Sequence, residues 1–377
     1  MTLTTSSFWE ISDSHGFLPN RGIAPELPQS ATAGAIRDVI DLSMSLGTID
    51  DNAVSERISS LGAPTGSTLR SLSPADAEIC LRAYAFVATR VIHGGLLDPG
   101  RTLQSAIAFP VWTLSERVGR PPSLTYASYI LANWNGSISP RALPESIEVS
   151  TTFTSTQDER WFIIVHLAVE SIGGEIVRGF KVCQEGILAK DVGRVSEGLN
   201  AIESALAWAV SALSRIDEQL RGDVFTTQVR PFLFGYNDVT FSGVTNTPTV
   251  AYVGETGAQS GVMRAADSGL GVKHSSAIGR PLERFLFYAP PPHRNYIAEL
   301  GGLGESIRQV ALTDREVRSK YNASLSALAA FRTLHYSVVD RYLSGARSVN
   351  PGFGTGGTAY QSWLRGLVEE TQEMILD

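Results

Sequence analysis

A histidine and an arginine three positions apart suggest chemistry more strongly than any other pair in this chain. His335 and Arg332 belong to an apolar stripe that a long helix would direct into a core. The stripe consists of Tyr321, Leu325, Leu328, Arg332, His335, Val339 and Tyr342. A buried arginine needs an anionic partner, and a buried imidazole needs a proton partner or a metal. A haem group would satisfy both residues, whereas the plainer alternative is bonding to ordinary core groups.

A second histidine lies inside the apolar segment Trp161–Glu170. Phe162, His166 and Glu170 follow one another at four-residue spacing, so a helix would place them on one face. Two interpretations stay open for His166. It is either a core histidine with satisfied hydrogen bonds, or a polar group that points into an aromatic pocket.

Helix signals dominate the elements that would position these residues. Ser73, Pro74 and Asp76 supply an N-cap, a first-turn proline and an acidic third position, which predicts a helix that ends at the glycines after His93. An unbroken apolar stripe predicts another helix over residues 194–220.

Two capping boxes predict two further helices. Thr313 with Glu316 opens one that contains His335, and Thr358 with Gln361 opens the last. The strand-like runs 147–153 and 249–253 are short. We therefore expect an all-α fold, with a smaller N-terminal domain over residues 1–140 and a large helical domain over 141–377.

Composition excludes several classes of protein. The 31 basic and 38 acidic residues give a net charge of −7 without a basic cluster, so no nucleic-acid partner is expected. Cys80 and Cys183 are far apart, which argues against disulfides, a cysteine-built zinc site and covalent haem. No signal peptide or membrane span is visible, so we expect a soluble cytoplasmic protein. Motifs of nucleotide-binding loops, zinc proteases and serine hydrolases are absent.

Six blocks of the sequence resemble those of the indoleamine 2,3-dioxygenase family, in the family's order and over nearly the whole chain. They are Gly16–Asn20, Arg120–Trp134, Gly257–Ser260, Ala289–Asn295, Phe331–His335 and Gly354–Thr358. The resemblance implies a helical domain that holds non-covalent b-type haem, ferrous in the active form, with a smaller N-terminal domain over the distal side of the haem.

The resemblance also implies roles for individual residues. His335 falls on the axial ligand of the iron, and Arg230 on the arginine that binds the substrate carboxylate. Thr355 falls on the threonine of a lid that closes over the substrate, in the glycine-rich segment 347–358, which we expect to be mobile. The positions near the haem are Arg332, Asp267, Glu255, Thr256 and Gly257, and those of the indole pocket are Tyr126, Tyr129, Ile130, Phe162 and Ile163.

Some residues depart from the family pattern. His166 replaces a small hydroxyl residue of the vertebrate members and resembles the histidine that contacts the indole N–H in tryptophan 2,3-dioxygenases. Glu255 and Thr256 replace smaller residues beside the haem. Thr226 stands where an aromatic residue often contributes to the pocket.

The implied reaction is cleavage of the indole C2–C3 bond of L-tryptophan by dioxygen, giving N-formylkynurenine, as in tryptophan catabolism through the kynurenine pathway. His166 would be catalytic through the indole N–H, or would instead ligate the resting iron. Two rival functions are oxygenation of another indole and haem binding without turnover. The sequence does not indicate an oligomeric state.

Overall fold

The structure is a computed structural model that describes residues 8–20, 22, 31–97, 101–245, 251–344 and 352–377. It is predominantly helical with two very short sheets, which confirms the predicted all-α fold. Among the described helices, none is long and apolar enough to cross a membrane.

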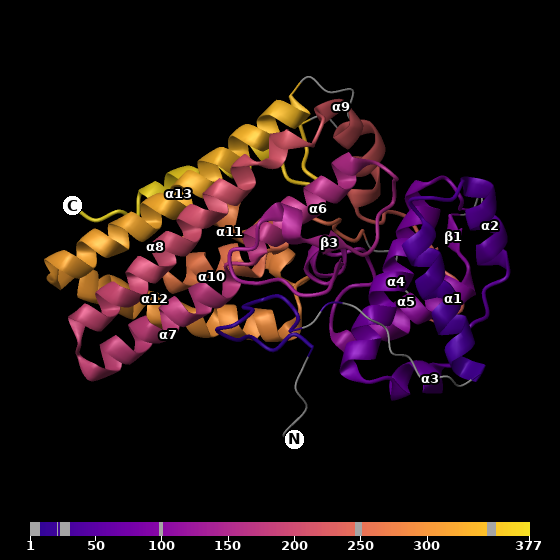
Figure 1. Ribbon diagram of the computed structural model, residues 1–377, viewed down its shortest axis with the longest axis horizontal. Coiled ribbons are helices and arrows are strands. Elements are labelled where there is room, and N and C mark those ends of the chain that lie inside the picture. Colours follow the sequence, from indigo (N-terminus) through magenta and orange to yellow (C-terminus); the bar gives the residue numbers. More distant parts are fainter. Residues whose placement is uncertain (1–7, 21, 23–30, 98–100, 246–250, 345–351) are drawn as a thin grey trace.

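Five helices of the N-terminal part gather at one end of the molecule (Figure 1). They are α1 (Ala31–Ser45), α2 (Asp51–Ser59), α3 (Gly66–Ser71), α4 (Pro74–His93) and α5 (Ser105–Val118). The predicted caps of α4 are confirmed, because the Ser73 side chain accepts a hydrogen bond from the Asp76 N–H and the helix stops at Gly94.

The longest helices, α8, α12 and α13, belong to the other end of the molecule (Figure 1). The helices of this part are α6 (Gln157–Glu170), α7 (Gly173–Ala189), α8 (Val192–Ser214), α9 (Gly222–Val224), α10 (Gly261–Gly269), α11 (Ser276–Leu286), α12 (Pro291–Thr313), α13 (Arg315–Leu343) and α14 (Tyr360–Gln372). Helix α8 packs between α7 and α13. Its crossing with α7 is close, since a Cβ on Gly198 would lie 2.6 Å from the carbonyl oxygen of Gly179.

Two helix starts differ from the sequence prediction. Asp314, not Thr313, caps α13, because its side chain accepts the Val317 N–H while Thr313 still belongs to α12. Helix α14 begins at Tyr360 after Ala359, which makes no side-chain cap bond, so the Thr358 cap is also wrong. In both places several polar residues precede the apolar run. Which of them caps the helix depends on the path of the chain that leads into it.

Short elements connect the two parts. Two are π-helical turns, η1 (Ala127–Leu131) and η4 (Phe225–Val229). Four are 3₁₀ turns, η2 (Pro144–Ser146), η3 (Ile216–Glu218), η5 (Arg230–Leu233) and η6 (Gly257–Gln259). Strand β1 (Thr102–Leu103) pairs in parallel with β4 (Thr240–Phe241), and β2 (Trp134–Asn135) pairs antiparallel with β3 (Glu148–Val149).

Two contacts bear on the predicted domain boundary at residue 140. The β2–β3 pair joins residues from both sides of it. The N-terminal segment 8–20 lies against the C-terminal helices, where the Phe17 ring is edge-to-face with His293 of α12 at 5.1 Å and Gly16 abuts Gly173 of α7. The boundary therefore stays a prediction, and residues 8–20 pack with the larger part.

Candidate active site

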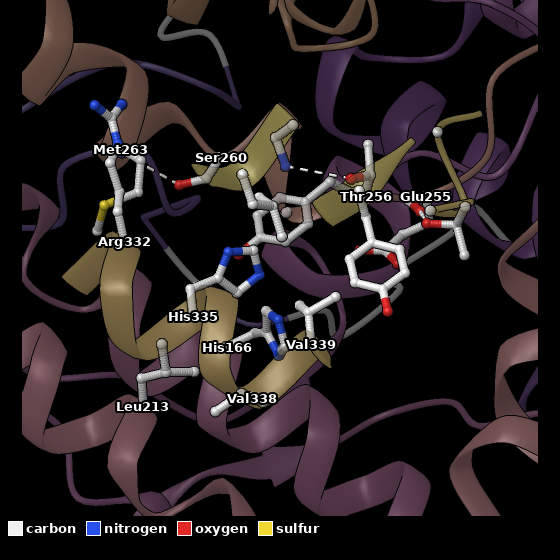
Figure 2. Close-up of a pocket in the computed structure, with 18 of the residues that line it drawn as sticks. His166, Leu213, Glu255, Thr256, Ser260, Met263, Arg332, His335, Val338 and Val339 are labelled. Carbon is white, nitrogen blue, oxygen red and sulfur yellow. Dashed lines mark hydrogen bonds between the residues drawn. The ribbon is translucent and has the colours of Figure 1, made fainter. Parts of the chain in front are cut away.

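One cavity lies between α6, the end of α8, α10 and α13, and the loops 254–260 and 354–358 close it (Figure 2). Most of its wall is apolar, and a few polar side chains converge on it. An enclosed apolar cavity with a few oriented polar groups is the usual form of a cofactor or substrate site.

His335 projects from α13 into this cavity (Figure 2). Its imidazole makes no hydrogen bond to any residue that the structure describes, and its ring lies nearly parallel to Phe331 with centroids 6.3 Å apart. Burial lowers the pKa of His335 to about 4, with smaller contributions from His166 and Arg332. The imidazole is therefore neutral at physiological pH, which is the state that binds a metal ion.

Arg332 lies one turn before His335 and is held by protein groups. Its guanidinium donates hydrogen bonds to the Asp267 carboxylate of α10 and to the Thr371 hydroxyl of α14. Arg264 binds the other Asp267 oxygen at 3.0 Å, and His274 Nε2 lies 3.5 Å from it. Burial alone would raise the pKa of Asp267, but Arg332 and these neighbours hold it well below its usual value. The anionic partner of the buried arginine is therefore Asp267.

His166 reaches the same cavity from α6, where it and Phe162 are less buried than the residues around them. Its Nδ1 lies 2.7 Å from the Phe162 carbonyl oxygen, which only accepts, so Nδ1 carries the proton. Burial lowers the pKa of His166 to about 4. A neutral imidazole with its proton on Nδ1 leaves the Nε2 lone pair available, and Figure 2 shows this ring in the same pocket as that of His335.

The aromatic wall is built from α6 and the two π-helical turns. Phe162 packs on His166 with centroids 4.2 Å apart and on Phe225 at 5.0 Å. Tyr126 precedes η1, and its hydroxyl donates to Glu170 at 3.1 Å. Ser260 donates to the same carboxylate oxygen. These bonds fix the position of Tyr126 in an aromatic wall of the cavity.

Arg230 and Thr355 connect the glycine-rich segment 352–358 to the cavity. Arg230 is 2% exposed, donates a hydrogen bond to the Phe353 carbonyl and lies 4.7 Å over the Phe234 ring. Thr355 donates to the Glu255 carbonyl at 2.6 Å. Residues 345–351, which include part of the segment predicted to be mobile, lie outside the described residues.

Comparison with known proteins decides the family. The family model described as indoleamine 2,3-dioxygenase matches residues 5–374. The chain belongs to the indoleamine 2,3-dioxygenase family. Indoleamine 2,3-dioxygenase 2 of Mus musculus is 28% identical over 302 residues, which cover 74% of each chain. Indoleamine 2,3-dioxygenase qulI of Penicillium citrinum is 28% identical over 394 aligned positions, covering 95% of this chain and 86% of its own. A myoglobin of Haliotis madaka is 27% identical over 260 residues, covering 66% and 67%.

Membership of the indoleamine 2,3-dioxygenase family makes this chain a haem-dependent dioxygenase that acts on an indole with dioxygen. The cavity fits non-covalent haem. It offers the unbonded, neutral imidazole of His335 and mostly apolar walls. A Cβ added to Gly257, in the loop beside it, would meet no atom within 4 Å, so this wall borders open space.

The cavity gathers most of the predicted site residues. Those that line it are Tyr126, Phe162, His166, Arg230, Glu255, Thr256, Gly257, Asp267, Arg332, His335 and Thr355. Tyr129, Ile130 and Ile163 are not on its wall. The Tyr129 hydroxyl instead donates to Glu159 at 3.1 Å, and the two isoleucines are fully buried. Successive helical positions turn by about 100°, so Ile163 points away when Phe162 faces the cavity.

Sequence reasoning missed several lining residues. Phe225 lines the cavity, whereas Thr226, which had been singled out, donates its hydroxyl to the Gly222 carbonyl at 2.8 Å within its own turn. Phe331 and Arg264 also line it. Phe331 was open to prediction, because it lies four positions before His335 on one helix face. Arg264 carried no comparable signal.

Proposed function

We propose that this dioxygenase cleaves the indole C2–C3 bond of L-tryptophan and adds both oxygen atoms, giving N-formylkynurenine. The observation that carries the proposal is the meeting of three side chains in one mainly apolar cavity. These are the neutral imidazoles of His335 and His166 and the buried guanidinium of Arg230.

His335 would hold the haem iron, since it is a neutral imidazole in the cavity without a protein hydrogen bond. Arg332 and Asp267 would keep α13 fixed against α10 and α14, and thereby keep the imidazole in place. The loop Glu255–Gly257 would border the cofactor. Haem, when bound, supplies the iron chemistry that activates dioxygen.

The substrate would lie against Tyr126 and Phe162. His166 Nε2 would accept a hydrogen bond from the indole N–H, because Nδ1 already donates to the Phe162 carbonyl. Holding the indole ring in one orientation contributes through proximity, roughly 7–11 kcal/mol when alignment is good. The competing role for His166 is ligation of the resting iron, which would give a bis-histidine spectrum that substrate abolishes.

Arg230 would bind the substrate carboxylate, for which a planar guanidinium is well suited. Thr355 would close the glycine-rich segment over the substrate, as its bond to the Glu255 carbonyl suggests. Closure would exclude water from the reacting ring.

Two rival functions have some support. The first is oxygenation of another indole, because Glu255 departs from the family pattern and adds a carboxyl group to the cavity. Similarity to Haliotis myoglobin favours haem binding without turnover. Against the second rival, the buried guanidinium of Arg230 in the cavity wall is a group that dioxygen alone does not need.

The test gives the reduced, haem-loaded protein L-tryptophan in air and analyses the products by mass spectrometry. We expect a product heavier by two oxygen atoms. A product from another indole only, or heavier by one oxygen, would support the first rival. A reversible oxygen spectrum without any product would support the second.

A further inference from the structure

Glu255 is a buried carboxyl group that faces the cavity and has no partner for its charge. It lies just before the η6 turn, is 2% exposed, and lines the cavity. Its Oε1 atom has no hydrogen bond to any described residue. Figure 2 shows Glu255 and Thr256 together on one side, with His166 and His335 on the other. Each unpartnered buried polar group requires an explanation, and a ligand is one.

The other charged groups of the cavity wall have protein partners. Arg332 and Arg264 share the Asp267 carboxylate, and Arg230 donates to the Phe353 carbonyl. Among the described lining residues, Glu255 is therefore the carboxyl group without a cation. Burial raises the pKa of Glu255 to about 8, so its side chain is largely protonated at neutral pH until a cation approaches.

Glu255 and Arg230 are attached to neighbouring points of the same segment. Arg230 donates to the carbonyl of Phe353, and Thr355 donates to the carbonyl of Glu255. Two residues span at most about 7 Å of chain, so the two anchor points are close. Next to this segment, Arg230 and Glu255 thus supply a cationic and an anionic side chain to the wall of one cavity. This arrangement is complementary to a molecule that carries a carboxylate and an ammonium group on adjacent positions.

We propose that Glu255 binds the ammonium group of the substrate, so that Arg230 and Glu255 together recognise both charges of an α-amino acid. The inference rests on the proposed function and assigns Glu255 to substrate selection. The ammonium group keeps its positive charge in the cavity, and Glu255 releases its proton to solvent when it binds this group.

The experiment measures the affinity of the haem-loaded protein, by calorimetry, for three indoles. L-Tryptophan carries both charges, tryptamine only the ammonium group, and indole-3-propionate only the carboxylate. Glu255→Gln keeps the shape of the side chain and removes its charge. We expect Glu255→Gln to lower the affinity for tryptophan and for tryptamine roughly 10- to 100-fold, because a bond between charged groups is lost. Indole-3-propionate should bind as before.

Two further variants make the result specific. Arg230→Gln should give the complementary pattern. It should lower the affinity for tryptophan and indole-3-propionate and leave the affinity for tryptamine unchanged. Glu283→Gln makes the same chemical change on an exposed position of α11 and should leave all three affinities unchanged. The inference would be overturned if Glu255→Gln lowered the affinity for all three indoles equally, or lowered the affinity for none of them.

Wild-type protein provides a measurement that does not depend on a variant folding. It should bind tryptophan at least about tenfold more tightly than indole-3-propionate. Equal affinities would overturn the role of Glu255 while leaving the proposed function intact. Wild-type protein that holds haem and binds none of the three indoles would overturn the proposed function itself, and the inference with it.

Discussion

Two walls of the cavity differ in how their polar groups are satisfied. The ligand wall contains Arg264, Asp267, Arg332 and His335, and both Asp267 oxygens there are paired, one with Arg332 and the other with Arg264. The substrate wall, made of Tyr126, His166, Arg230 and Glu255, keeps spare capacity. His166 Nε2 and the Glu255 carboxyl have no bond to a described residue.

This difference separates two tasks. Buried ion pairs such as those of Asp267 are rigid, because removing either member leaves another charge without a partner. Such pairs can hold one imidazole in a constant position. Polar atoms that lack partners are instead poised to bind something that enters. Substitutions in the two walls should therefore fail in different ways, through cofactor and stability on one side and through substrate on the other.

The largest effect is expected for His335→Ala on the ligand wall. It removes the imidazole proposed to hold the iron, so haem affinity should fall at least about tenfold. Haem content and the absorption spectrum after purification measure this, and added imidazole should restore part of the binding. His15→Ala, a histidine in an N-terminal turn, is the control. A His335→Ala protein with full haem content and an unchanged spectrum would contradict the assignment.

The second effect concerns the Asp267 network. Asp267→Asn leaves Arg332 and Arg264 without their buried carboxylate, which should lower the free energy of unfolding by about 3–5 kcal/mol. Thermal unfolding of the haem-free protein measures it. Glu185→Gln breaks an exposed ion pair with Arg194 and should lower the free energy of unfolding by less than about 1 kcal/mol. Similar losses in the two variants would refute the distinction between the walls.

His166→Ala tests the substrate wall and should spare haem binding. Loss of the bond to the indole N–H should raise the Michaelis constant for tryptophan by about tenfold. The Michaelis constant for 1-methyltryptophan, which lacks that N–H, should change little. Since the pKa of His166 is about 4, the imidazole stays neutral between pH 6 and pH 8, and the discrimination should be constant over that range. An unchanged ratio of the two Michaelis constants in the variant would exclude the contact.

The smallest effect is expected for Thr355→Ala. It removes one hydrogen bond between the glycine-rich segment and the Glu255 carbonyl, so the Michaelis constant for tryptophan should rise roughly two- to fivefold. Steady-state kinetics measure it, with Thr355→Ser as the variant that keeps the hydroxyl. If Thr355→Ser behaves like Thr355→Ala, the hydroxyl has no role in closure.

Local signals predicted much of the fold. The caps of α4 and the apolar stripe of α8 follow from periodicity and capping alone, although α8 ends at Ser214 and not at residue 220. His335 and His166 were selected because polar residues on apolar helix faces need partners, and both line the cavity. The start of α13 was missed because Thr313 and Asp314 are both good capping residues.

Other features depend on tertiary structure and left no local signal. The pairing of Arg332 with Asp267 joins positions 65 residues apart. The burial of Glu255 depends on how the loop 254–260 and the segment 352–358 meet. Tyr129 and Ile130 were expected on the cavity wall, but η1 is a wider, π-helical turn that directs them elsewhere.

The two π-helical turns have a consequence for how this cavity can change in evolution. A π-helical turn holds one residue more than the α-helical turn that it interrupts. Deleting one codon within Ala127–Leu131 or Phe225–Val229 would remove this extra residue and change the direction of side chains inside the turn, while the flanking residues keep nearly the same orientation. Phe225, which lies inside η4 and lines the cavity, would be displaced, while α13, which carries His335, would stay untouched. The aromatic wall can thus be altered by a single-residue deletion that preserves the cofactor site.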